Sequence, residues 1–196
     1  MANARLTIPV LSTLLAAALA IAGSGSLAGC GGGTTSGSGG GGGGSSCGLM
    51  ADGCFDYACF KADAPTVSFK ADVLPILRNS CGLSTSCHGG ETGPAGQHYL
   101  GPKKSDPEPT AAQIQMIFDQ WVGQTPSVNA GMNLISPKDP EHSFFMYKLD
   151  GLKCAKLTCA SDNSCLALMP QGTTEPMDAA QRDVFRRWIA QGAKND

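Results

Sequence analysis

Two cysteines and a histidine stand close together in the segment NSCGLSTSCHGG, residues 79–90. A cysteine followed directly by a histidine is typical of covalent haem attachment, where the usual run is Cys-x-x-Cys-His. In that chemistry both sulfurs form thioethers and the imidazole binds the iron. Here five residues, rather than two, separate Cys81 from Cys87, and His88 follows.

The longer spacer leaves more than one chemistry open. On a regular helix, Cys81 and Cys87 would lie about 9 Å apart along the axis, so Gly82–Ser86 must form a loop for the two sulfurs to meet. Its Gly, Ser and Thr content permits such a loop. Once looped, the pair could hold a haem, could form a disulfide at a Cα separation of about 5.5–6 Å, or could act as a metal or redox-active dithiol site.

The remaining cysteines indicate an oxidising compartment. The chain has nine cysteines, and eight are left when Cys30 is set aside. An even number in an exported chain predicts a disulfide framework. If Cys81 and Cys87 hold a haem, the other six cysteines make three bridges; if they do not, all eight make four. The eight are Cys47, Cys54, Cys59, Cys81, Cys87, Cys154, Cys159 and Cys165.

The N-terminus predicts export and anchoring. Arg5 precedes a short apolar run that leads into small residues, the pattern of a secretory signal. The run LAGC, ending at Cys30, resembles a bacterial lipobox, which implies a signal peptide over 1–29 and lipidation of Cys30. An ordinary signal peptide or an uncleaved anchor is the alternative. Residues 30–46 are then the lipidated cysteine and a flexible linker, because residues 31–46 contain only Gly, Ser and Thr.

Two segments follow the linker. Residues 47–66 carry three cysteines and no clear periodicity, so we expect an extension stapled within itself or to residues 154–165, with a metal site as the alternative. The chain as a whole has a formal net charge of −2 and no basic stripe, which does not favour a nucleic-acid partner.

Residues 67–196 are predicted to be all-α with long, disulfide-tied loops. Apolar periodicity predicts helices within 68–81, 110–124, 139–150 and 178–191. Pro75 indicates a bend or a late start in the first helix. Thr110, Asp139 and Asp178 are the expected N-caps, the last with a capping-box pattern. The expected buried faces comprise Phe69, Val73, Leu74, Ile76 and Leu77; Ile114, Ile117, Phe118, Trp121 and Val122; Phe144, Phe145 and Leu149; and Val184, Phe185, Trp188 and Ile189.

Four stretches in this order resemble the cytochrome c-like domains of exported planctomycete and myxobacterial proteins. They are FKADVLPILRNSC with CHGG, then MNLISPKDPEHSFFMYKLDG, then MPQG, then RRWIAQGA, and together they span about residues 67–196. The resemblance implies a small cytochrome c-like helical domain. Residues 47–66 and the cysteine-bearing insert at 154–165 lie outside that pattern.

The resemblance also implies site residues. Cys81 and Cys87 would form the thioethers, His88 would be the proximal iron ligand, and Met169 the distal one. Such a His/Met pair favours electron transfer because it leaves no open iron position. Met146 and Met177 are fallback sulfurs, whereas the other imidazoles, His98 and His142, are expected at the surface. Trp121, Phe145 and Trp188 could exclude water from the ring.

The implied function is that of a membrane-tethered c-type cytochrome-like electron carrier with one haem. It would be lipid-anchored in the periplasm or at the outer membrane or cell surface, and its partners would be redox proteins of the envelope. The alternative is a haem-free, disulfide-stapled binding or structural module with a Cys81–Cys87 bridge. A hydrolytic enzyme is a distant third, because no Ser-His-Asp order, carboxylate pair or zinc-binding helix motif stands out.

Overall fold

The computed structural model describes residues 47–92, 97–126, 131–151 and 167–196, and the single positions 154, 157 and 165. The predicted signal peptide, Cys30, the linker and Cys159 lie outside the described residues. Within these ranges the fold is helical and contains no strand, only isolated bridges. No helix in the described part of the chain is both long and apolar enough for a bilayer crossing. The all-α prediction is therefore confirmed at the level of secondary structure.

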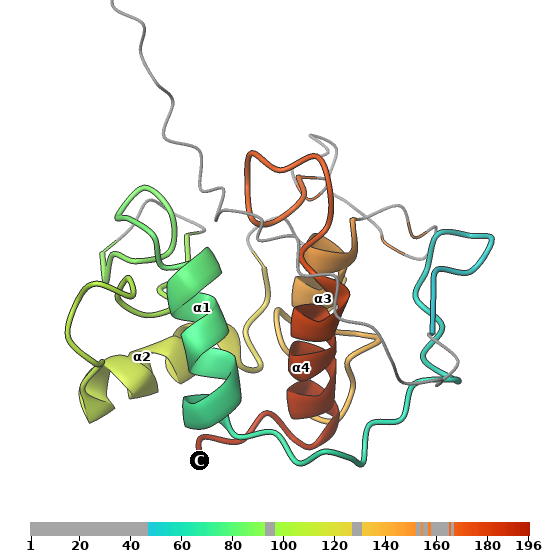
Figure 1. The fold of residues 1–196 in the computed structure, drawn as a ribbon, viewed down its shortest axis with the longest axis horizontal. Helices are drawn as coiled ribbons and strands as arrows, with labels where there is room; N and C mark the ends of the chain where they lie inside the picture. The colour runs from blue at the N-terminus through green and yellow to red at the C-terminus, as the bar shows by residue number, and fades with distance from the viewer. Residues whose placement is uncertain are drawn as a thin grey trace, which may run out of the picture.

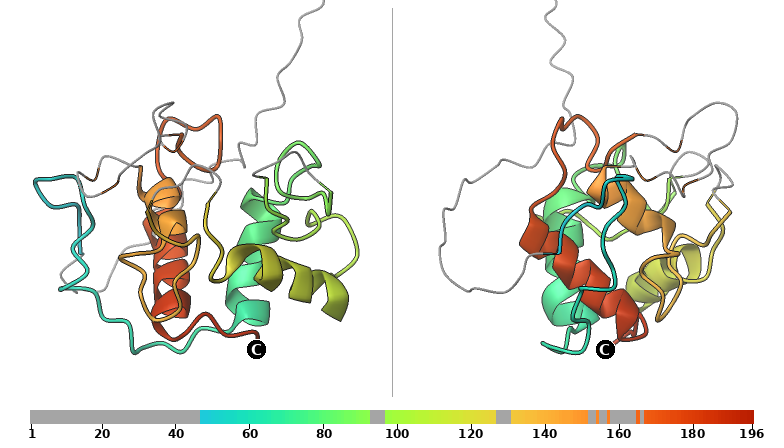
Figure 2. Two further views of the ribbon diagram at one scale, coloured as in Figure 1. Left: turned by 180° about the vertical axis from the view of Figure 1, so that it is seen from behind. Right: turned by 90° about the vertical axis from the view of Figure 1, so that its right-hand side faces the viewer.

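The elements follow in the order expected from the sequence (Figure 1). A π-helical turn, η1 (Phe69–Val73), leads directly into α1 (Leu74–Ser80), and Pro75 lies in the first turn of α1. The later helices are α2 (Ala111–Trp121), α3 (Phe144–Asp150) and α4 (Ala179–Ala190). Figures 1 and 2 show α1 and α2 on one side of the molecule and α3 and α4 on the other.

Local capping explains where α2 and α4 begin. Thr110 and Gln113 form a capping box at the start of α2, in which each side chain accepts from the other residue's backbone amide. The Asp178 side chain accepts from two amides of the first turn of α4. Both predicted N-caps are confirmed.

The predicted start of α3 is wrong by four residues. The N-cap is Ser143, whereas Asp139 and Pro140 lie in a preceding turn. Asp139 accepts from the backbone amide of His142, so its carboxylate closes that turn instead of capping a helix. The predicted end is confirmed, because Gly151 adopts a left-handed conformation at φ 101° that favours glycine.

One core joins the helices. η1 and α3 both pack against α4. Trp188 of α4 stacks on Trp121 of α2 at 5.4 Å between ring centroids, and Trp121 meets Phe145 of α3 edge to face at 4.7 Å. The three aromatic residues expected to exclude water thus belong to a single buried cluster. Fully buried members of the core include Phe69, Val73, Leu77, Ile117, Leu149, Phe185 and Ile189.

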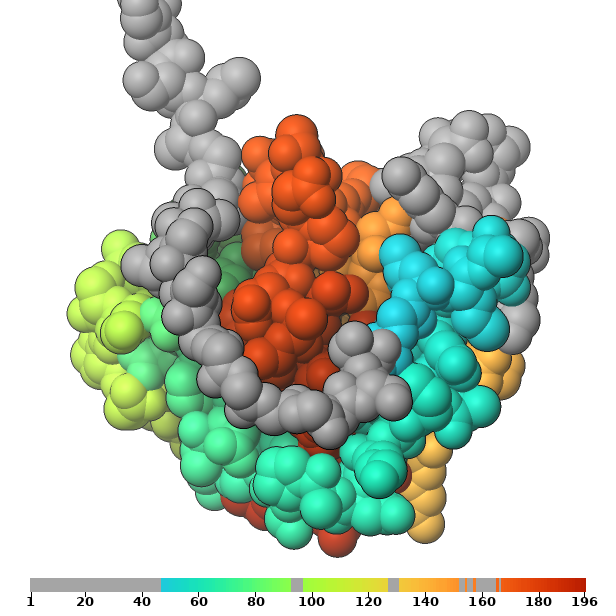
Figure 3. Space-filling view, turned by 45° about the vertical axis from the view of Figure 1, so that its right-hand side comes forward, coloured from blue at the N-terminus to red at the C-terminus, as the bar shows by residue number. Residues whose placement is uncertain are grey.

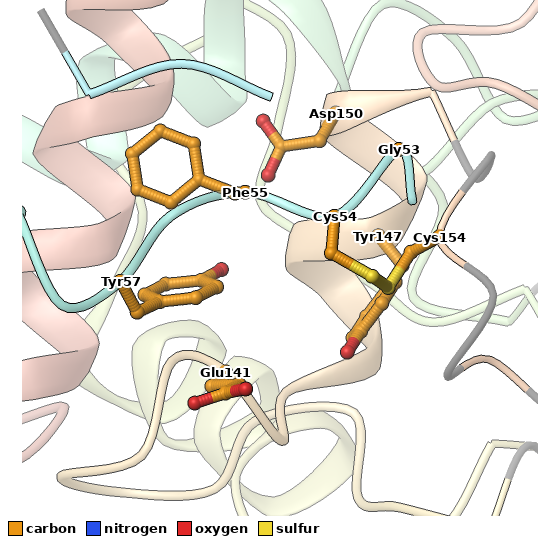
Figure 4. A pocket seen from close by; sticks show the side chains of 8 residues that line it. All are labelled: Gly53, Cys54, Phe55, Tyr57, Glu141, Tyr147, Asp150 and Cys154. Carbon is orange, nitrogen blue, oxygen red and sulfur yellow. A yellow bond between two sulfur atoms is a disulfide. The ribbon is translucent and has the colours of Figure 1, made fainter. Parts of the chain in front are cut away.

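The extension at 47–66 is fixed by two disulfides, Cys47–Cys59 and Cys54–Cys154. Both pairings match the expectation of a segment stapled internally and to the 154–165 region. Because the three extension sulfurs are all in disulfides, the alternative of a thiolate metal site there is wrong. The close-up in Figure 4 shows Cys54 bonded to Cys154 beside α3.

A buried ion-pair cluster lies where the extension meets the helices. Asp150 at the end of α3 accepts from both Arg182 and Arg186 of α4. The Arg186 side chain is 1% exposed, and its guanidinium carbon lies 3.6 Å from the centre of the Phe55 ring. This arginine therefore connects α4 with both α3 and the extension.

Candidate functional site

The segment between Cys81 and His88 folds back on the end of α1. Leu77 accepts from the backbone amides of both Cys81 and Gly82 at 2.8 Å, which ends the helix. The His88 amide then donates to the Cys81 carbonyl at 3.0 Å, so the two residues become neighbours across the loop. The loop that the sequence required of Gly82–Ser86 is therefore present.

A close backbone approach explains Gly82 within this loop. A Cβ atom at this position would lie 2.5 Å from the Gly101 carbonyl oxygen, closer than any real contact allows. The glycine lets the 97–102 segment pack against the loop. The amide of Leu100 in that segment donates to the His88 carbonyl at 2.9 Å, which fixes His88 from a second side.

His88 has one ring nitrogen committed to the protein. Its Nδ1 lies 2.7 Å from the His98 carbonyl oxygen, and since a carbonyl can only accept, Nδ1 carries the proton. The neutral ring then presents Nε2 as an acceptor, the form in which imidazole binds a metal. Burial lowers the pKa of His88, and the nearby positive charge of Lys148 lowers it further. Both effects favour the neutral imidazole.

His98 lies beside His88, whereas His142 is exposed as expected. The surface position predicted for His98 is wrong: its side chain is partly buried, and burial together with the neighbouring His88 lowers its pKa. Its backbone holds the Nδ1 side of the His88 ring, opposite Nε2. His142 is exposed and pairs with the Asp139 carboxylate. No sequence pattern marked His98, because its burial depends on the packing of two loops.

The two cysteines of the motif have different states. Cys81 is a free thiol in the main core, 7% exposed, and burial raises its pKa to about 12. Cys87 is disulfide-bonded, and since Cys81 is free, the partner is another cysteine. The alternative of a Cys81–Cys87 bridge is therefore wrong. Cys81 stays outside the disulfide framework, and its thiol is enclosed by side chains of the main core.

Met169 lies beside Lys148 of α3, the residue whose positive charge lowers the pKa of His88. Its amide donates to the Lys148 carbonyl at 2.9 Å, and its side chain packs, partly buried, against the core. The Lys148 ammonium donates to the Cys165 carbonyl at 3.3 Å, and burial lowers the pKa of Lys148 to about 8. Lys148 thus bonds to the Met169 segment through its carbonyl and acts on His88 through its charge, although none of the described contacts joins His88 to Met169 directly.

The fallback sulfurs are less suited to an iron ligand. Met146 is fully buried within α3 and Met177 is 7% exposed, and both belong to the main core.

The described pocket between the extension and α3, shown in Figure 4, has room for about one water molecule and so cannot hold a cofactor.

The residues fit a haem in their axial chemistry and not in its covalent attachment as the chain stands. A neutral, partly buried imidazole with Nδ1 bonded to a carbonyl suits an axial ligand. A thioether at Cys87 is incompatible with its disulfide, because the same sulfur cannot form both bonds. Double attachment therefore requires prior reduction of that disulfide.

Comparisons with family models, curated proteins and solved structures found no match to this chain.

Proposed function

We propose that this chain is a membrane-tethered, cytochrome c-like electron-transfer protein that binds one haem. The observation that carries the proposal is the bond between His88 Nδ1 and the His98 carbonyl, which leaves Nε2 available to an iron. Burial and the Lys148 charge keep the imidazole neutral and so able to coordinate. The order of the four cytochrome-like sequence stretches supports the same reading.

In this proposal each residue has one role. His88 would hold the iron through its ring nitrogen and Met169 through its sulfur. Cys81 and Cys87 would be the attachment cysteines, once a dithiol reductant of the envelope had reduced the Cys87 disulfide and been oxidised in turn. A haem iron with His and Met ligands carries one electron and has no open position for substrate. The protein then contributes ligation and burial, and the chain is a carrier rather than an enzyme.

The cell envelope is the proposed location. The signal pattern and the LAGC run favour lipidation at Cys30, and the Gly/Ser linker would then be a tether. The two described disulfides are typical of an oxidising compartment. Tethering would raise the local concentration of the domain near redox proteins of the envelope, its proposed partners.

One observation favours a haem-free module of the envelope instead. Cys87 is bonded to another cysteine and the Cys81 thiol is enclosed in the core, so the fold is complete without thioethers. In this alternative the Cys87 disulfide is a permanent staple and the domain binds or supports other envelope components.

A comparison of two histidine variants tests the proposal. The chain, His88→Ala and the matched control His142→Ala should be produced with a haem-attachment system and their visible spectra recorded. We expect a low-spin haem spectrum for the chain and for His142→Ala, and its loss in His88→Ala. If His88→Ala keeps the low-spin spectrum, His88 is not the ligand.

The distal ligand needs its own comparison. Met169→Ala should lose the low-spin spectrum, whereas Met177→Ala, which removes a sulfur from the main core, should keep it. The reverse result would assign the sulfur ligand to Met177.

A further inference from the structure

Two neighbouring apolar side chains are exposed at the tip of the N-terminal extension. Leu49 is 56% exposed and Met50 is 39% exposed, and they are the large hydrophobic side chains exposed among the described residues. Single exposed apolar residues are common on proteins, but this pair is adjacent and sits in a run, 48–52, that is exposed throughout. The exposed apolar surface is therefore concentrated at one place.

The tip is held in a defined shape. Leu49 pairs with Phe55 as an antiparallel bridge, and the Met50 amide donates to the Cys54 carbonyl at 2.7 Å. The Cys47–Cys59 disulfide closes the segment. We call residues 47–59 the hairpin, with Leu49 and Met50 as its tip.

The hairpin is also fixed to the body of the protein. The Cys54–Cys154 disulfide joins it to the chain after α3, and Phe55 packs on the Arg186 guanidinium. In Figures 1 and 3 the hairpin (cyan) lies at the edge of the molecule. The tip is thus presented rigidly at the surface rather than folded into the core.

The tip lies close in sequence to the predicted lipid anchor, which indicates a membrane as its binding surface. The predicted lipidated residue, Cys30, is separated from Cys47 by residues 31–46, and a Gly/Ser segment of that length has a typical reach of about 20–24 Å. The tip begins at Leu49, three residues beyond the last residue of this tether. A short tether of this kind would therefore hold Leu49 and Met50 near a bilayer to which Cys30 is anchored.

The charged residues of the hairpin indicate which lipid headgroups it can bind. Residues 47–59 contain Asp52 and Asp56 and no lysine or arginine. Asp52 and Asp56 each accept from a backbone amide two residues later, which turns both carboxylates toward the hairpin backbone. A tip without basic residues gains nothing from anionic headgroups and inserts through its apolar side chains alone.

From these observations we infer that Leu49 and Met50 insert into the interface of a zwitterionic lipid surface and orient the tethered domain on the membrane. The inference rests on the lipid anchor of the proposed function and not on the haem.

Tryptophan fluorescence tests it in the full lipidated chain reconstituted in phosphatidylcholine vesicles. Trp121 and Trp188 are buried and give a constant background. Leu49→Trp reports on the tip, and Lys104→Trp is the matched control, because residues 103–105 are exposed and lie on the side opposite the hairpin (Figure 2). Each variant is compared in vesicles with brominated and unbrominated acyl chains.

We expect brominated lipid to quench Leu49→Trp at least twofold more than Lys104→Trp, and Met50→Asp in the Leu49→Trp chain to reduce that quenching. Adding anionic lipid should not strengthen it. Equal quenching of the two reporters, or none at Leu49→Trp, would overturn the inference.

Two controls separate this result from the proposed function. The visible spectrum reads haem content independently, so quenching at the tip in a haem-free chain still supports the inference. If intact mass shows no lipid on Cys30, a polyhistidine segment replacing residues 1–30 and a chelating lipid attach the same tether to the vesicle. Absence of quenching in that arrangement also overturns the inference.

Discussion

At the scale of single residues, Cys81 shows how burial controls thiol chemistry. The thiolate is the nucleophile, and enclosure in the core raises the pKa of Cys81 to about 12, so the thiol stays protonated and shielded. In the haem-free chain we expect iodoacetamide at pH 8 to leave Cys81 unmodified in the native state and to modify it in denaturant, as read by peptide mass mapping. Failure to react in denaturant would mean that Cys81 is bonded after all.

The partial burial of Lys148 can be tested through the pH dependence of the free energy of unfolding. Its pKa is about 8 in the folded chain and 10.5 without burial, because burial disfavours the charged form. Between these values the unfolded chain binds more protons, so this lysine makes the free energy of unfolding rise with pH from about 8 to 10.5. Lys148→Met should therefore exceed the wild type in stability most at pH 7, and by progressively less towards pH 10.

Urea unfolding of both proteins at each pH measures that difference. The comparison cancels the contributions of Cys81 and the tyrosines, which are present in both chains. A difference that stays constant from pH 7 to pH 10 would contradict the partly buried position of Lys148.

At the scale of elements, one carboxylate joins α3 to α4 through two arginines. Asp150 is 10% exposed and accepts from Arg182 and Arg186, so its removal would take the described carboxylate partner from Arg182 and leave Arg186 paired with Asp183 alone. Losing one member of such a buried cluster costs about 3–5 kcal/mol. We expect Asp150→Ala to reduce the free energy of unfolding by about that amount in chemical denaturation.

Asp139→Ala is the matched control for that prediction. Asp139 also pairs with a basic side chain, His142, but both are exposed, and surface pairs contribute about 0–1 kcal/mol. Equal losses for the two variants would show that the Asp150 cluster is not buried in solution.

The elements also show which features the sequence can predict. Helices α2 and α4 follow from local signals, because apolar periodicity and the caps at Thr110 and Asp178 lie within the segments themselves. Arg78 and Arg186 were not predicted to be buried, since each depends on distant partners. Arg78 donates to carbonyl oxygens of the loop at 102–107, and Arg186 bonds to Asp150. The start of α3 was mispredicted because the local Asp139–Pro140 pattern also suits a turn.

In the candidate site, the loop after Cys81 was predicted from its composition and is present. The role of His88 as an iron ligand stays a prediction, based on its place after Cys87. The states of the two cysteines and the burial of His98 could not be predicted, because they are decided by segments brought together from elsewhere in the chain.

At the scale of the whole molecule, the Cys54–Cys154 disulfide is the longer of the two bridges whose partners are both described. It spans 100 positions, whereas Cys47–Cys59 spans 12. Because the entropy of the unfolded chain falls more when a longer loop is closed, the long bridge is expected to contribute about 4.7 kcal/mol and the short one about 3 kcal/mol. Replacing both cysteines of each pair by alanine should therefore lower the denaturation midpoint more for the 54/154 pair.

The order of these two effects is the test, and the measurement is urea unfolding of the two double variants side by side. A larger loss from the 47/59 pair would mean that the extension contributes little to the stability of the domain beyond its own loop.

The central claim, that this fold holds a haem, is tested most directly by intact mass. The full chain should be co-expressed with a haem-attachment system, purified, and its mass measured with and without alkylation. We predict a mass gain equal to one haem together with a visible haem spectrum. A mass without haem, with Cys81 alkylated only after unfolding and Cys87 still in a disulfide, would contradict it and establish the haem-free module.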